Sequence, residues 1–318
     1  MVDVTWLLHF CASSFRSLAH HEPLAPLNNP NHLNRRTFLV RSSAAIAASA
    51  AGCFAYAVGV EPHWLEIVER DLAVENLPPA LVGARLAQIS DLHIGPQVSD
   101  DYIIHSFDRL RALAPDIIVI TGDFLTHRYS RGDAQYLQLR NVLTHLPHGR
   151  LATLGILGNH DYGHRWGDLA VAERVMAEGE RAGVRMLRNA SQAVAGLDFV
   201  GVDDLWSHLG DPVTALKGRE SAAAIVLVHN PDAADQQPWP GFRGWMLAGH
   251  THGGQCKPPF LPPPLLPVQN RRYVAGEVSV DARRTLYISR GVGHLIRARF
   301  LVRPEMTLFT LRTAARSI

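Results

Sequence analysis

The sequence has few cysteines and little net charge, and each shortage excludes a class of protein. Cys11, Cys53 and Cys256 are the three cysteines among 318 residues, and two of them precede the expected folded domain, so a disulfide framework is excluded. The formal net charge is +2, whereas a nucleic-acid-binding domain normally carries a strong basic excess. Internal repeats and coiled-coil heptads are also missing. What remains is a globular composition, 47% hydrophobic and 19% charged, in a chain long enough for one large domain or two ordinary ones.

The N-terminal region differs in kind from the rest of the chain. Arg35 and Arg36 stand shortly before residues 42–60, a 19-residue stretch without charge. Adjacent arginines ahead of an Ala-rich apolar run resemble a twin-arginine (Tat) export signal. At about 1.5 Å per residue, the run is also just long enough to remain as an anchor in a bilayer core of about 30 Å. We therefore predict a signal or membrane anchor at residues 34–60, with the Tat translocase and the membrane as partners.

Other interpretations of this region stay open. The run is alternatively a short buried helix, and "AAGC", which ends at Cys53, weakly resembles a lipoprotein cleavage site, although Ala50 stands where leucine is usual. A retained anchor places the catalytic domain on the periplasmic side of a bacterial inner membrane. Signal cleavage would instead release a soluble protein, and inward orientation would place the domain on the cytoplasmic face. Residues 1–33 stay unassigned.

Beyond this region, five β-rich apolar runs each end in a polar turn. The runs cover residues 85–90, 116–121, 151–157, 222–228 and 244–248, and helical patterns cover residues 100–113, 134–146 and 169–182. Continuous apolar strands are buried on both faces, and their alternation with helices predicts a layered α/β fold. We expect a connector at residues 61–79, one folded domain at 80–312 and a tail at 313–318.

The turns that follow these strands carry Asp, His and Asn side chains. Parallel strands place their C-terminal turns along one edge of a sheet, where open α/β folds bind ligands. Seven candidate metal ligands therefore come together: Asp91, His93, Asp123, Asn159, His229, His250 and His252. Seven ligands are too many for one tetrahedral zinc and suit two cations that share a carboxylate. Two divalent cations outweigh the two aspartates, so the site should attract anions such as phosphate.

Five short motifs, taken together and in order, resemble the calcineurin-like metallophosphoesterase superfamily. They are "DLH" at 91–93, "GD" at 122–123, "GNHD" at 158–161, "HNPD" from His229 and "GHTH" at 249–252. The longer "GHTHGGQ", the N-terminal signal and "SRGVG" at 289–293 are most similar to the bacterial membrane-associated or exported branch. The resemblance implies a four-layer αββα sandwich, with two mixed β-sheets inside and helices outside.

The resemblance also implies roles for single residues. One metal would be held by Asp91, His93 and His252, the other by Asn159, His229 and His250, and Asp123 would bridge them. His160 would contact the phosphate and protonate the leaving oxygen, and Asp161 would orient its imidazole. His294 and Arg290 are candidates for substrate binding. Mn, Fe, Zn and Co all accept mixed nitrogen and oxygen ligands, and we favour Mn.

These residues predict a binuclear phosphoesterase that hydrolyses a phosphodiester or pyrophosphate bond by attack of a hydroxide shared by the metals. The proline-rich apolar segment 258–268 follows the last metal-binding turn. It is either a packed loop or an apolar lip that meets lipid, so the expected substrate is membrane lipid-linked. One alternative is a UDP-2,3-diacylglucosamine pyrophosphatase of lipid A synthesis, a cytosolic reaction that conflicts with export. Another is a non-catalytic metal-binding scaffold, which the complete ligand set disfavours. The oligomeric state has no signal in the sequence.

Overall fold

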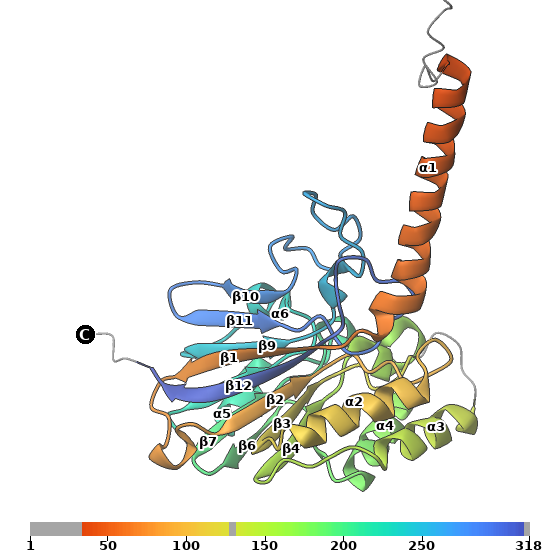
Figure 1. Ribbon diagram of the computed structural model, residues 1–318. Helices are drawn as coiled ribbons and strands as arrows, with labels where there is room; N and C mark the ends of the chain where they lie inside the picture. The colour runs from red at the N-terminus through yellow and green to blue at the C-terminus, as the bar shows by residue number, and fades with distance from the viewer. Residues whose placement is uncertain (1–33, 127–131, 315–318) are drawn as a thin grey trace, which may run out of the picture. The chain divides into compact units, whose positions relative to one another are not determined.

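The computed structural model describes residues 34–126 and 132–314 (Figure 1). The chain divides into two units, Met1–Ser49 and Ala50–Ile318. Helix α1 (Arg35–Ala55) continues through a π-helical turn (Tyr56–Val60) into a short 3-10 helix (Glu61–His63). Within the described residues, one helical segment, Arg35–His63, is long and apolar enough to cross a membrane by length and composition, as a signal sequence also would be.

The first sheet is mixed and has the strand order β1-β12-β2-β3-β4-β5. Its strands are β1 (Glu66–Val74), β2 (Arg85–Ile89), β3 (Ile117–Thr121), β4 (Ala152–Ile156), β5 (Arg185–Met186) and β12 (Glu305–Thr313). β12 runs antiparallel to β2, and the other neighbours are parallel. β2, β3 and β4 fall within the runs predicted from the sequence, and their side chains are almost entirely buried, as two covered faces require.

The second sheet is also mixed, with the order β10-β11-β9-β8-β7-β6. Its strands are β6 (Ala190–Val194), β7 (Leu197–Gly201), β8 (Ala224–Leu227), β9 (Gly244–Ala248), β10 (Gly276–Ser279) and β11 (Arg284–Ile288). The four central strands are parallel to one another, and the two edge strands pair antiparallel to them. A parallel arrangement brings the ends of β8 and β9 to one edge.

Three hydrophobic clusters define four layers. One cluster lies between the sheets and takes alternate residues from each, such as Leu86, Val119 and Phe199. The second packs the outer face of the first sheet against α2 (Asp100–Ala112), α3 (Asp133–Leu143) and α4 (Leu169–Arg181). The third packs the second sheet against α5 (Pro212–Lys217) and α6 (Ala233–Gln236). The predicted sandwich of two mixed sheets between helices is confirmed, and Figure 1 shows α2, α3 and α4 gathered on one side of it.

The stretch 61–79, which the sequence predicts to be a connector, is instead built into the fold. β1 pairs in parallel with β12 from Glu66 opposite Glu305 to Val74 opposite Thr313. The misleading signal is the charged run Glu69–Arg70–Asp71, which is exposed because β1 is an edge strand. Charged side chains on an edge strand discourage pairing with other chains. The folded domain therefore begins before residue 80, and β12 ends just past residue 312.

Candidate metal centre

The seven candidate ligands all lie in turns after strands, at one end of both sheets. Asp91 and His93 follow β2, Asp123 follows β3, and Asn159 opens a short 3-10 helix (Asn159–Tyr162) after β4. His229 follows β8, and His250 and His252 follow β9. All seven are at most 5% exposed. The two sheets thus contribute ligands to a single buried site, as the carboxyl ends of the strands in α/β folds commonly do.

Five of these residues have a backbone conformation that L-residues rarely adopt. The φ angles are 54° at Asp91, 49° at His93, 56° at Asp123, 73° at His250 and 50° at His252. Each such residue costs of order 1–3 kcal/mol, and this strain clusters at functional sites in proteins. The fold therefore holds these side chains in place against a local conformational cost.

Two glycines in the motifs are explained by close approach of the ligands. A Cβ on Gly249 would lie 2.4 Å from Oδ2 of Asp91, and one on Gly158 would lie 2.3 Å from Oδ1 of Asp123. Real Cβ atoms do not approach oxygen so closely. The glycines of "GHTH" and "GNHD" thus leave room for the carboxylates.

The first group of ligand atoms belongs to Asp91, His93 and His252. The Nε2 atoms of the two imidazoles are 3.0 Å apart, and Nε2 of His252 lies 3.3 Å from Oδ1 of Asp91. The three residues can offer ligand atoms that all lie within 4.8 Å of one another. This is the set that the family resemblance implies for one metal.

The second group is organised by two fixed imidazole tautomers. Nδ1 of His229 lies 2.7 Å from the carbonyl oxygen of Thr121, and Nε2 of His250 lies 3.0 Å from that of Pro267. A carbonyl only accepts, so these nitrogens carry the protons in neutral rings. The remaining nitrogens, Nε2 of His229 and Nδ1 of His250, then face each other at 3.3 Å with lone pairs. Once His229 has lost its second proton, both nitrogens offer lone pairs to a cation bound between them. Oδ1 of Asn159 lies 3.0 Å from Nδ1 of His250 and completes the group.

Asp123 joins the two groups. Its Oδ2 lies 3.1 Å from Nε2 of His229 and 3.6 Å from Nε2 of His93. Asp91, Asp123 and His229 also form a compact set of possible ligands. The protein therefore has two buried metal-binding groups that share a carboxylate, as a binuclear site requires.

Electrostatics keep most of the imidazoles in the ligating form. Burial lowers the pKa of His93 and of His250 to about 3, and it lowers the pKa of His252 well below its usual range. These rings are neutral near pH 7 and offer a lone pair to a cation. Burial raises the pKa of Asp91 to about 6, which still leaves this carboxyl mostly ionised at neutral pH.

Asp123 and His229 form a coupled pair. Burial opposes ionisation of Asp123, but the charge of His229 and of other nearby imidazoles outweighs it and holds the pKa of Asp123 well below its usual range. Burial likewise opposes protonation of His229, and Asp123 outweighs it and raises the pKa of His229 well above normal. A cation that binds here must displace that proton, so metal affinity should fall in acid.

His160 and Asp161 lie beside the ligands but use different contacts. The backbone N–H of His160 donates to Oδ1 of Asp123 at 2.9 Å, and its ring lies edge-on to that of His93. The described hydrogen bonds of the Asp161 carboxylate come from the backbone N–H groups of Gly158, Phe124 and Leu125, not from the His160 imidazole. Asp161 thus ties the turn after β4 to the turn after β3, a contact that its place in "GNHD" does not reveal.

The two candidate substrate-binding residues have hydrogen-bond and ion-pair partners outside the ligand set. His294 is fully buried and its Nε2 lies 3.1 Å from the carbonyl oxygen of Gln97. Arg290 forms ion pairs with Glu305 and Glu66. Its side chain also lines a cavity of about 760 Å³ that reaches Gly253, the neighbour of a ligand.

Arg299 is a residue of the site that the sequence does not reveal. Its side chain is fully buried, and Nη2 lies 3.2 Å from Nδ1 of His252. The same nitrogen donates to the carbonyl oxygens of Arg290, Gly291 and Gly293. The guanidinium therefore links the "SRGVG" turn to a ligand. Its position among several arginines of a basic segment hides this role.

Two tryptophan rings pack next to the ligand His250. Trp206 lies edge-on to His250, with ring centroids 4.5 Å apart, and Trp166 packs against Trp206 at the same distance. Neither tryptophan belongs to a motif, so only the fold brings them to the ligands.

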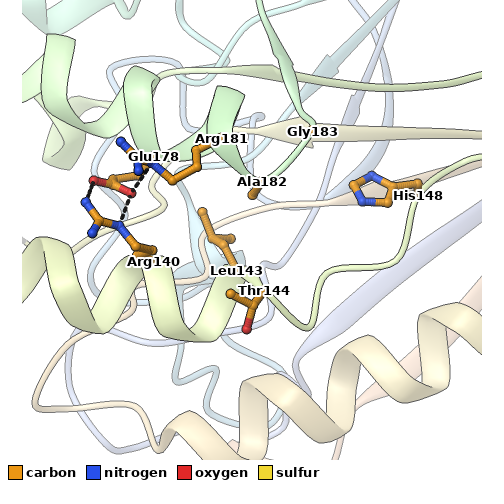
Figure 2. Close-up of a pocket in the computed structure, with 8 residues that line it drawn as sticks. All are labelled: Arg140, Leu143, Thr144, His148, Glu178, Arg181, Ala182 and Gly183. Atoms are coloured by element: carbon orange, nitrogen blue, oxygen red, sulfur yellow. Dashed lines mark hydrogen bonds and ion pairs between the residues drawn. The ribbon is translucent and has the colours of Figure 1, made fainter.

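A separate hollow between α3 and α4 is not part of the centre. It has a volume of about 410 Å³ and is lined by Arg140, His148, Glu178 and their neighbours, none of which is a candidate ligand. Figure 2 shows the Arg140–Glu178 ion pair across it, and each charge has its partner there. The hollow is best explained as a surface groove between helices.

Comparison with known proteins defines the class. Residues 84–254, which include every candidate ligand, match the family of calcineurin-like phosphoesterases. The chain belongs to this family, and it is a metal-dependent phosphoesterase.

Three relatives are similar over almost their whole length. The uncharacterized metallophosphoesterase YkuE of Bacillus subtilis is 32% identical, over 88% of this chain and 98% of that protein. The phosphodiesterase YaeI of Escherichia coli is 31% identical, over 88% of this chain and 99% of that protein. The UDP-2,3-diacylglucosamine pyrophosphatase LpxG of Chlamydia trachomatis is 24% identical, over 85% and 96%.

Proposed function

We propose that the chain is a membrane-anchored binuclear enzyme that hydrolyses the phosphodiester or pyrophosphate bond of a lipid-linked substrate. The observation that carries the proposal is the position of Asp123 between two groups of buried ligand atoms. When bound, two divalent cations, with Mn favoured over Fe, Zn and Co, would activate a water and neutralise charge on the phosphate oxygens. Asp91, His93 and His252 would hold one cation, and Asn159, His229 and His250 the other.

His160 supplies the proton for the leaving oxygen in this proposal. Its backbone is fixed by Asp123, and its ring lies beside His93 at the edge of the ligand cluster, where a phosphoester would reach it. Asp161 acts as a positioning residue, because its three backbone contacts hold the turn that carries His160. Arg290 and His294 stay candidates for substrate contact.

The lipid-linked substrate is supported by the position of the segment 258–268. The Pro267 carbonyl fixes the tautomer of His250, so one end of this segment touches the centre. Phe260, Leu261 and Leu265 in the same segment are largely exposed. A second candidate is cleavage of UDP-2,3-diacylglucosamine, the substrate of the chlamydial pyrophosphatase that this chain resembles. The two candidates differ in the headgroup and in the compartment of the substrate.

The proposed location is the periplasmic side of a bacterial inner membrane. Arg35, Arg36 and Arg41 place three positive charges ahead of the apolar part of α1. Positive flanks stay in the cytoplasm, so the domain after the helix would be exported by the Tat translocase with α1 retained as an anchor. Release by cleavage and a cytoplasmic orientation are the two competing outcomes.

The test uses the purified full-length chain in detergent, stripped of metal with a chelator and then supplied with Mn, Fe, Zn or Co. Hydrolysis is measured on bis-p-nitrophenyl phosphate, a phosphatidylglycerol and UDP-2,3-diacylglucosamine. We expect a cation to restore hydrolysis, most strongly Mn, and the lipid substrates to compete with the small diester. Hydrolysis of the UDP-lipid alone would select the second candidate. Absence of cation-dependent hydrolysis on all three would mean a non-catalytic scaffold.

A further inference from the structure

The end of the N-terminal helix is fixed to the catalytic unit. The carbonyl oxygen of Ala57 accepts a hydrogen bond of 2.9 Å from the backbone N–H of Arg299. The carboxylate of Glu61, which is fully buried, accepts from the backbone N–H groups of Leu301 and Val302. Tyr56 packs edge-on against Phe300. Residues 56–61 are therefore part of the folded unit.

Exposed apolar side chains gather around this attachment. They are Phe54 and Val60 at the helix end, Phe260, Leu261 and Leu265 in the loop after the last ligands, and Ile296 and Leu301 in the segment after "SRGVG", all more than half exposed. The backbone N–H of Lys257 donates to the carbonyl oxygen of Phe300, which joins the two loops. Phe260, Leu261 and Leu301 also line one cavity. Exposed apolar side chains gathered on neighbouring segments mark a site of interaction.

The charges and aromatic rings on this surface suit the headgroup region of a bilayer. Lys257 and Arg297 are exposed, and residues 253–268 and 295–303 contain no acidic side chain. Trp64 is 51% exposed and lies beneath the guanidinium of Arg303, at 4.2 Å from its ring centroid. Basic residues attract anionic lipids, and tryptophan is enriched where membrane meets water.

We propose that these elements form one bilayer-facing rim, made of residues 54–64, 257–266 and 295–303. A bilayer is the fitting occupant because the chain leads directly from the rim into a helix long enough to cross one. The rim holds the domain against the membrane surface. The cavity of about 760 Å³ extends from Phe260 and Leu301 in the rim to Gly253, the residue after the candidate ligand His252, so it opens from the rim towards the centre. The inference rests on the anchoring part of the proposed function and not on the identity of the substrate.

The test labels single cysteines with an environment-sensitive fluorophore in the full chain, after Cys11, Cys53 and Cys256 are replaced by serine. Phe260→Cys and Ile296→Cys probe the rim, and Leu137→Cys on α3 and Val82→Cys, both at positions more than half exposed, are the controls. Each protein is placed in nanodiscs of phosphatidylcholine and phosphatidylglycerol, with and without spin-labelled lipid.

We expect a blue-shifted emission and quenching by the spin-labelled lipid at the two rim positions and neither at the controls. Equal quenching at all four positions, or at none, overturns the proposal. A blue shift without quenching would mean that a second copy of the chain covers the rim, which also overturns it. Ala44→Cys reports whether α1 is inserted in the bilayer. Absence of quenching there would show that α1 is not a membrane anchor, which also overturns the proposal. Hydrolysis of a soluble diester, measured on the same samples, separates failure of the centre from failure of the rim.

Discussion

The backbone N–H of His160 donates to Oδ1 of Asp123, while the other oxygen of the same carboxylate faces the ligand atoms of His229 and His93. Asp123 therefore does two things at once. One oxygen faces ligand atoms of both candidate groups, and the other accepts a hydrogen bond from the turn that carries the candidate proton donor. Removal of this carboxylate and removal of the His160 ring should consequently have different effects on metal content.

Asp123→Ala should abolish metal binding at both positions, because each group loses its shared ligand. Metal content measured after equilibration with Mn should fall from about two per chain to near zero, with activity lost in parallel. His105→Asn, on the exposed face of α2, is the control and should keep both metals. Retention of two metals by the Asp123 variant would show that the bridging role is wrong.

His160→Ala should keep its metals and lose turnover. A positioned acid typically contributes 10²–10⁴-fold, so kcat for a diester should fall by roughly that factor. The loss should be smallest on a substrate whose leaving group needs no proton, such as p-nitrophenolate. Loss of metal in this variant, or an equal loss of kcat on every leaving group, would contradict the assignment.

Replacement of Phe260, Leu261, Leu265 and Leu266 by serine should lower turnover of lipid substrates in vesicles. These side chains lie in the loop after the ligands, three of them largely exposed, so the fold and the centre should tolerate the change. Hydrolysis of soluble bis-p-nitrophenyl phosphate is the control and should be unchanged. An equal loss on both substrates would indicate that the loop serves packing.

The stability of the protein should depend on pH through His294. Burial, and then the charge of Arg299, lower the pKa of this imidazole to about 4, against about 6.5 in an unfolded chain. Between these values the unfolded state binds a proton that the folded state does not. Stability therefore falls as pH falls from about 6.5 to 4, by up to about 3 kcal/mol from this group.

His294→Gln should remove this contribution, because glutamine can still donate to the Gln97 carbonyl but does not titrate. Urea unfolding at pH 7.5 and pH 5, both in chelator, gives the comparison. The difference in stability between the two pH values should be smaller in the variant. Parallel profiles would show that His294 is protonated equally in both states.

Export should depend on the arginine pair. Residues 1–80 fused to a reporter that works only outside the cytoplasm should give activity with Arg35 and Arg36 and none when both are lysine. Fractionation should find the native fusion in the membrane if α1 is retained, and in the soluble periplasm if it is cleaved. A reporter silent in both forms would place the domain in the cytoplasm and favour the nucleotide-linked substrate.

Much of the fold and the centre is predictable because each motif sits where a regular element ends. Apolar runs predict β2, β3, β4, β8 and β9 to within a few residues, and their turns carry the seven candidate ligands. The contacts that only tertiary structure creates are not predictable in this way. Arg299 contacts His252, which lies 47 residues earlier in the chain. Trp206, which follows β7, packs against His250, which follows β9. β1 is not predictable from the sequence for a different reason, because the charged residues of this edge strand resemble the composition of a linker.

The pairing of β1 with β12 sets the order in which the protein can be completed. β12 lies between β1 and β2, so neither strand can form this pairing until residues 305–313, near the end of the chain, have been synthesised. Contacts this distant in sequence form late. When the arginine pair and α1 have left the ribosome, the sheet that follows them is still missing its second strand. Synthesis must finish before the domain closes, which suits a translocation route that accepts finished domains. Loss of the last strand would leave β1 without a partner and β2 with an unpaired edge.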